Sequence, residues 1–372
     1  MSKILVHAGP PKTGSTQFQA LLNENSEVLN EHLITKLSPQ LKPSIRPYFQ
    51  AFNKARRASG IERFDRYPWF SDISESAFLR KDGHEHSIVS EEALFKLFPH
   101  TYELSAFDKL LSEMYEYRTY LVVLREINGL ITSQISQAIK GVRRFDYLSC
   151  QGPLKRYSLD RLFEGVITNE YDLEIRTFNQ LVRSPDSYAT ASEVLQRTFN
   201  RPNINLKKIE GIKNKSLGAE GTAILLAYNN IIRMIIGQQE LDRLRIEIRD
   251  AGRALDDKIM QNFPTQHKFC PFSETEQSRF NDRQLKRSQK FIAYAPGAWV
   301  DEVFTPVINK KSIVLLSQLD SADRSVAVEM LEHHIHKILR QCSPLNKSIS
   351  HTTVTDAIAV FLKDETKLVL GD

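Results

Sequence analysis

Residues 9–16 form a glycine-containing loop, Gly-Pro-Pro-Lys-Thr-Gly-Ser-Thr, directly after the short apolar run 4–6. An apolar run, a glycine turn and then Ser15, a residue type that favours helix starts, predict a strand, a tight turn and a helix. Backbone N–H groups in such a turn, together with the positive end of the helix dipole, form a cradle for an anion. The loop therefore indicates an α/β fold with an anion site, and a turn without a ligand is the alternative.

Gly9 and Gly14 have the spacing of a nucleotide-binding Walker A loop, but the lysine is displaced. A Walker lysine follows the second glycine and serves the terminal phosphates of a nucleotide beside a metal ion. Here Ser15 occupies that position, and Lys12 lies inside the loop. The displacement argues against a kinase or NTPase, which we keep as an alternative in the form of an enzyme with an atypical loop.

The second half of the loop resembles the 5′-phosphosulfate loop of the sulfotransferase family, whose usual form is Pro-Lys-[Thr/Ala/Ser]-Gly-[Ser/Thr]-Thr. The likeness is to bacterial carbohydrate sulfotransferases and to the enzymes that act on glycosaminoglycans, and it covers about residues 3–296. It implies a P-loop NTPase-like three-layer α/β fold with a central parallel sheet flanked by helices. It also implies 3′-phosphoadenosine 5′-phosphosulfate (PAPS) as donor, 3′-phosphoadenosine 5′-phosphate (PAP) as product and no metal. The residues implied to hold the donor's 5′ end are Pro11, Lys12, Thr13, Gly14, Ser15 and Thr16.

A second motif follows an apolar, β-branched run at 119–124, which predicts a buried central strand. The run ends at Arg125, and Ser133 follows eight residues later. In the sulfotransferase family an Arg and a Ser at this spacing hold the 3′-phosphate of the donor, so the resemblance implies this role here. A guanidinium suits it because its N–H groups match two phosphate oxygens. The family usually has Asp-Pro or Glu-Pro after the Arg, whereas this chain has Glu126-Ile127, and a salt-bridged surface arginine is the alternative.

The general base is expected at the end of another predicted strand, within residues 86–92. Ser90-Glu91-Glu92 resembles a Ser-Ser-Glu-like tripeptide of the family, which implies Glu92 as the base and Glu91 as the second choice. The alternative is that both carboxylates stabilise the first turn of a helix at 93–98. Sulfuryl transfer is an in-line displacement in which the protein positions groups and stabilises charge. Lys12 is implied to stabilise the leaving phosphate oxygen.

The 372 residues are 41% hydrophobic and 26% charged, as in globular proteins. The sequence has no run of ~20 apolar residues, so it predicts no membrane span. The net charge of +5 is spread along the chain without a nucleic-acid-binding motif, so we expect an anionic donor rather than nucleic acid. The expected acceptor is a hydroxyl or amine, on a glycan by family analogy. Without an apolar leader, the chain is expected to be cytoplasmic. An inactive relative that binds a glycan or a partner protein is the third alternative.

We predict a sulfotransferase-like domain at 1–298, with a basic helical insert at about 36–80, and a mostly helical extension at 299–372. An apolar stripe at 323–339 predicts a helix that packs on the core or on a partner chain, which would make an oligomer. Residues 16–30 predict one helix after the loop. Two helix starts are indicated by capping-box spacings, Thr190 with Glu193 and Ser273 with Glu276.

Overall fold

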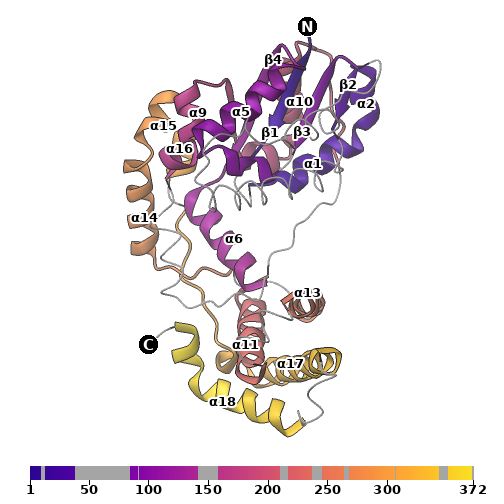
Figure 1. Ribbon diagram of the computed structural model, residues 1–372. Coiled ribbons are helices and arrows are strands. Elements are labelled where there is room, and N and C mark those ends of the chain that lie inside the picture. Colours follow the sequence, from indigo (N-terminus) through magenta and orange to yellow (C-terminus); the bar gives the residue numbers. More distant parts are fainter. Residues whose placement is uncertain are drawn as a thin grey trace, which may run out of the picture. The chain divides into compact units, whose positions relative to one another are not determined.

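The computed structural model describes residues 1–9, 13–37, 84–90, 92–140, 158–209, 217–236, 245–263, 268–305, 307–342 and 351–370 (Figure 1). The chain divides into two compact units, each made of separate pieces of sequence. The first unit comprises Met1–Ile127, Tyr157–Ile212 and Asn281–Pro306, and the second comprises Asn128–Arg156, Lys213–Phe280 and Val307–Asp372. This division differs from the predicted boundary after residue 298. Most of the predicted basic insert, residues 38–83, lies outside the described residues.

The described part of the first unit is an α/β fold around a five-stranded parallel sheet, as the sequence predicts. The strand order is β2-β3-β1-β4-β5, so the strand that precedes the glycine loop is central. The strands are β1 (Lys3–His7), β2 (Ile34–Lys36), β3 (His86–Ser90), β4 (Tyr117–Leu124) and β5 (Leu173–Thr177). Helices of this unit that lie between or after the strands include α1 (Ser15–Glu24), α2 (Ser26–Glu31), α5 (Thr101–Ser112), α9 (Glu164–Asn169) and α10 (Ser187–Phe199).

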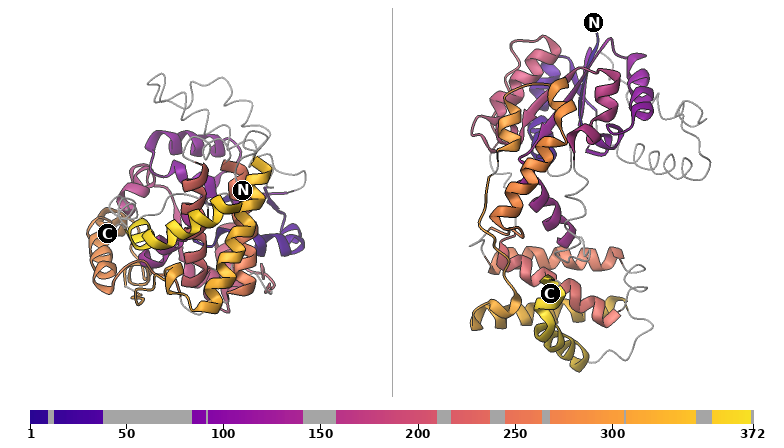
Figure 2. Two further views of the ribbon diagram at one scale, coloured as in Figure 1. Left: turned by 90° about the horizontal axis from the view of Figure 1, so that it is seen from below. Right: turned by 90° about the vertical axis from the view of Figure 1, so that its left-hand side faces the viewer.

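Helices lie on both faces of the sheet (Figure 2). On one face, Leu5 and Leu121 belong to a core cluster with Phe18 of α1 and Leu195 of α10. On the other face, the ring of Tyr120 contacts the buried ring of Phe98, which precedes α5. Burial on both faces explains why these strands are nearly continuous apolar runs.

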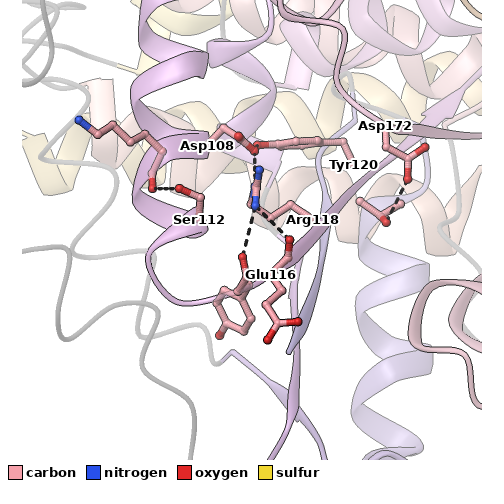
Figure 3. A network of polar contacts seen from close by, with 9 residues as sticks. Asp108, Ser112, Glu116, Arg118, Tyr120 and Asp172 are labelled. Atoms are coloured by element: carbon pink, nitrogen blue, oxygen red, sulfur yellow. Dashed lines mark hydrogen bonds and ion pairs between the residues drawn. The ribbon is translucent and has the colours of Figure 1, made fainter. Parts of the chain in front are cut away.

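A polar network fastens α5 to the first half of β4 (Figure 3). Asp108 accepts hydrogen bonds from Arg118 Nε (2.9 Å) and from the hydroxyl of Tyr120 (2.8 Å). Burial, followed by the charge of Asp108, raises the pKa of Tyr120 well above its ordinary value, so the phenol stays a donor. These residues lie toward the amino end of β4, away from its carboxyl end. The network therefore stabilises the packing of α5 on the sheet.

The carboxyl ends of β1 and β4 lie at a topological switch point of the sheet. After β1 the chain continues to β2 on one side, and after β4 it continues to β5 on the other side. In open parallel sheets, ligands bind beyond the carboxyl ends of neighbouring strands whose connections leave in opposite directions. His7 and Leu124, the last residues of β1 and β4, therefore mark the place where a site is expected.

The described part of the second unit is helical. Its long helices are α11 (Ala219–Ile236), α13 (Arg245–Asn262), α17 (Ser321–Cys342) and α18 (His351–Leu370), which contact one another. Leu331, Ile335 and Ile338 of the predicted apolar stripe are buried, so α17 packs this face within the unit. None of the described helices is both long enough and apolar enough to cross a membrane.

The remaining helices complete the described chain. They are η2 (Glu92–Leu97), α6 (Ile127–Lys140), α8 (Leu159–Leu162), η3 (Asn179–Arg183), α14 (Glu274–Lys286), α15 (Gln289–Tyr294), α16 (Trp299–Phe304) and η4 (Leu316–Gln318). Two of them bear on the site directly. The η2 helix follows β3, and η3 follows β5, so both begin at the carboxyl edge of the sheet.

Candidate functional site

Gly14 starts the helix that follows the loop, and its backbone is in the left-handed region with φ of 93°. Its carbonyl oxygen accepts hydrogen bonds from the N–H groups of Gln17 (2.9 Å) and Phe18 (3.1 Å). A Cβ at this position would lie 2.1 Å from Cγ2 of Val182 and 3.4 Å from the ring of Phe178. Both the backbone conformation and the lack of space therefore require glycine. The predicted order of strand, loop and helix from Ser15 is confirmed.

The hydroxyl groups of the loop lie partly inside the protein. Thr13 and Ser15 are buried, and Thr16 is exposed at the start of α1. A Cβ on Gly9 would lie 2.8 Å from Thr13 Oγ1 and 3.6 Å from the carbonyl oxygen of Val123, so Thr13 lies across the loop toward β4. Ser15 Oγ is buried and has no hydrogen-bond partner among the described residues. A buried hydroxyl of this kind fits a phosphate oxygen as its acceptor. Pro11 and Lys12 lie outside the described residues.

Arg125 follows the last residue of β4, and its half-buried guanidinium lies over the ring of Phe178 at 4.4 Å from the centroid. The guanidinium of Arg183 lies 5.4 Å from the centroid of the same ring. Burial, and then the positive charge of Arg183, lower the pKa of Arg125 from its ordinary value to about 10, while Glu126 opposes the shift. Arg125 therefore stays charged near neutral pH. Burial and the neighbouring positive charge disfavour this charged form, and a bound anion would stabilise it.

Phe178 connects the predicted anion residues to one another. Its ring contacts the Arg125 guanidinium and lies next to the backbone of Gly14. The structure therefore brings Gly14 of the loop and Arg125 to the same aromatic ring. Local sequence patterns do not single out Phe178 and Arg183, because neither belongs to a motif. The one available signal is the position of Phe178 at the end of the alternating run 173–178, which is typical of a strand.

The end of β3 is tied to β1 and to α1. His7 Nδ1 lies 2.7 Å from Ser90 Oγ, and Gln19 Nε2 donates to the carbonyl oxygen of Ser90 (2.7 Å). Burial lowers the pKa of His7 to about 4, so this imidazole is neutral near pH 7. These two contacts hold the strand end from which the predicted base extends. Glu92 is the first residue of η2, and Glu91 lies outside the described residues.

Ser133 lies in α6, is partly buried and belongs to the second unit. The structure thus describes it separately from Arg125, which belongs to the first unit. The predicted pairing of Arg125 with Ser133 on one phosphate therefore stays a prediction.

A cavity of about 560 Å³ lies in the first unit beside β5. It is lined by residues at and around this strand and by the segment from Tyr294 to Trp299. Hydrogen bonds stiffen its wall, since the Tyr294 hydroxyl donates to the carbonyl oxygen of Tyr171 (2.5 Å). No residue predicted for the donor or for catalysis lines this cavity, so we treat it as separate from the candidate site.

Comparison with models of protein families, with curated proteins and with solved structures found no match for this chain. The case for a function therefore rests on the chain's own residues. Its strongest elements are the left-handed Gly14 at the start of α1 and the guanidinium of Arg125 beside the same aromatic ring.

Proposed function

We propose that this protein is a PAPS-dependent sulfotransferase with a P-loop NTPase-like fold. It would move a sulfuryl group from PAPS to a hydroxyl or amine acceptor, which we take to be a carbohydrate, in the cytoplasm. One observation carries the proposal: the turn at Gly14 and the guanidinium of Arg125 meet at Phe178, beyond the carboxyl ends of β1 and β4. A donor with phosphates at both ends of its ribose needs two such anion sites close together.

In this proposal the loop and the arginine divide the donor between them. The backbone N–H groups from Thr13 onward, together with the Ser15 hydroxyl, hold the 5′-phosphate at the positive end of α1. Arg125 holds the 3′-phosphate, the role that the resemblance implies for it. The mechanism that the resemblance implies needs no metal, because Lys12 supplies the positive charge at the leaving oxygen.

Catalysis in this proposal uses a carboxylate to remove the acceptor's proton. Glu92 begins η2 directly beyond the end of β3, and β3 is the neighbour of β1 in the sheet. The contacts of Ser90 with His7 and Gln19 hold this end of β3 against β1 and α1. That rigidity supports the placement of a base near the loop, since general bases must lie within hydrogen-bond reach of the acceptor.

The binding test is calorimetric titration with PAP in the absence of magnesium, with ATP as the comparison. We expect PAP to bind without metal and Arg125→Ala to weaken it at least about tenfold, because a charge-assisted contact to phosphate is lost. Arg201→Ala is the matched control, since this exposed arginine pairs with Glu85. Preference for magnesium-ATP would favour a kinase or NTPase, and no binding of either nucleotide would favour an inactive relative.

Removing the base should separate chemistry from binding. We expect Glu92→Gln to lower sulfuryl transfer by about 10²-fold or more, because a positioned base is lost, while PAP affinity stays within about twofold. The measurement is the transfer rate from PAPS beside PAP calorimetry. Glu91→Gln is the matched control. If that variant loses activity and Glu92→Gln does not, the base is Glu91.

A further inference from the structure

We propose that Arg183 binds the 3′-phosphate of the donor together with Arg125. The two guanidiniums would contact this phosphate from two sides and form a clamp. This inference rests on the proposed function and deepens it. Arg183 belongs neither to the glycine loop nor to the motif of Arg125 and Ser133. The clamp is inferred because Arg183 and Arg125 contact the same ring, that of Phe178. "Clamp" here means Arg125, Arg183 and the Phe178 ring that both of them contact.

The clamp holds two positive charges at close range. Both guanidinium carbons lie within 5.4 Å of one ring centroid, a distance at which an aromatic face attracts a cation. The ring offsets part of the repulsion between the two charges but adds no full negative charge. A phosphate monoester, with a charge of about −2 near neutral pH, would attract both guanidiniums and accept hydrogen bonds from each.

Arg183 has its charge available for a ligand. Its side chain is exposed, and no described carboxylate forms an ion pair with it. By contrast, Arg176 and Arg197 on the same stretch both pair with Glu174. Arg183 instead lies beside the ring that it shares with Arg125, an arrangement that a bound anion would stabilise.

The helix that carries Arg183 is fastened to the loop. Arg183 is the last residue of η3, and Val182 before it packs against Gly14. The carbonyl oxygen of Val182 accepts a hydrogen bond from Gln17 Nε2 of α1 (3.1 Å). The first turn of α1, which would hold the 5′-phosphate, is therefore joined directly to the residue before Arg183. This attachment ties the clamp to the start of α1, as a donor with phosphates at two positions requires.

The experiment compares PAP with adenosine 5′-phosphate, which lacks only the 3′-phosphate, by calorimetry on the full chain. We expect Arg183→Gln to weaken PAP about tenfold and adenosine 5′-phosphate less than about twofold, so that the preference for the bisphosphate shrinks. Arg183→Lys should retain part of the preference, because it keeps the charge but loses the planar donors. The matched control is Arg197→Gln, another exposed arginine of the first unit. Thermal unfolding should be unchanged in all three variants.

The outcomes separate the clamp from the proposed function. Equal weakening of both nucleotides, or no weakening of PAP, by Arg183→Gln would overturn the clamp. If Arg125→Ala abolishes the preference for PAP while Arg183→Gln leaves it intact, the clamp fails and the sulfotransferase proposal stands. If the unaltered protein shows no preference for PAP over adenosine 5′-phosphate, the proposed function fails and the clamp fails with it.

Discussion

Lys12→Ala is expected to remove most of the sulfuryl-transfer activity while the protein stays folded. In the proposed reaction the bond between sulfur and the bridging oxygen breaks, and negative charge develops on the phosphate that leaves. A cation held at that oxygen stabilises the transition state more than the bound donor. Loss of one such preorganised group lowers turnover by about 10²–10³-fold in well-studied enzymes. The measurement is the steady-state transfer rate from PAPS to an accepted sugar, beside the thermal unfolding midpoint.

The fold should survive this change because other residues hold the loop. Ile4, Leu5 and Val6 are buried in β1, and Gly14 holds the start of α1. Lys109→Ala is the control, because Lys109 is an exposed lysine on α5 and has no place in the proposed reaction. Full activity in Lys12→Ala would refute the proposed role of the loop lysine. Lost activity with an unchanged affinity for PAP would show that the lysine acts on the reaction rather than on binding.

Gly14→Ala is expected to have the second large effect, on both stability and nucleotide binding. A non-glycine residue in the left-handed region costs roughly 1–2 kcal/mol. The new Cβ would also lie 2.1 Å from Cγ2 of Val182, and overpacking of this kind costs roughly 1–3 kcal/mol more. We expect the free energy of unfolding of the first unit to fall by about 2–5 kcal/mol and PAP binding to be lost. Denaturant unfolding and calorimetry measure the two effects.

A double variant separates the two causes. Gly14→Ala with Val182→Ala removes the overlap and keeps the backbone strain, so it should recover part of the lost stability beyond the cost of Val182→Ala alone. Gly297→Ala is the control for a glycine of the same unit, where the new Cβ would lie 3.0 Å from the edge of Trp299. If Gly14→Ala binds PAP as well as the unaltered protein does, the turn at Gly14 is not the anion cradle.

Helix starts show how far local sequence predicts structure. The Ser273–Glu276 box is confirmed: the Ser273 N–H donates to Glu276 Oε2 (2.9 Å), and the Glu276 N–H donates to Ser273 Oγ (3.3 Å). The box predicted from Thr190 is wrong, because α10 already begins at Ser187. Residues in the first turns of α10, such as the fully buried Ala191, pack against the core. This packing decides where the helix begins and outweighs the capping-box spacing of Thr190 and Glu193.

A break between two helices and one short strand depend on contacts with distant parts of the chain. The helix predicted at 16–30 is two helices, separated at the buried Asn25. The side chain of Asn25 donates to the carbonyl oxygen of Lys207 (3.1 Å) and accepts from the N–H of Lys207 (2.6 Å). A partner 182 residues away leaves no signal in the local pattern. Strand β2 was missed for the same reason, because its three residues become a strand only by pairing with β3.

The sequence by itself determined the central strands, the glycine loop before α1, and the placement of Arg125 at the end of β4. These features depend on residue types at short spacings, which set burial, backbone conformation and capping within a few residues. Only the tertiary structure decided that Phe178 and Arg183 lie beside Arg125, and that each compact unit is assembled from separate pieces of the chain. Such contacts join residues far apart in sequence, and their free energy comes from packing and charge in the folded protein, which no local spacing records.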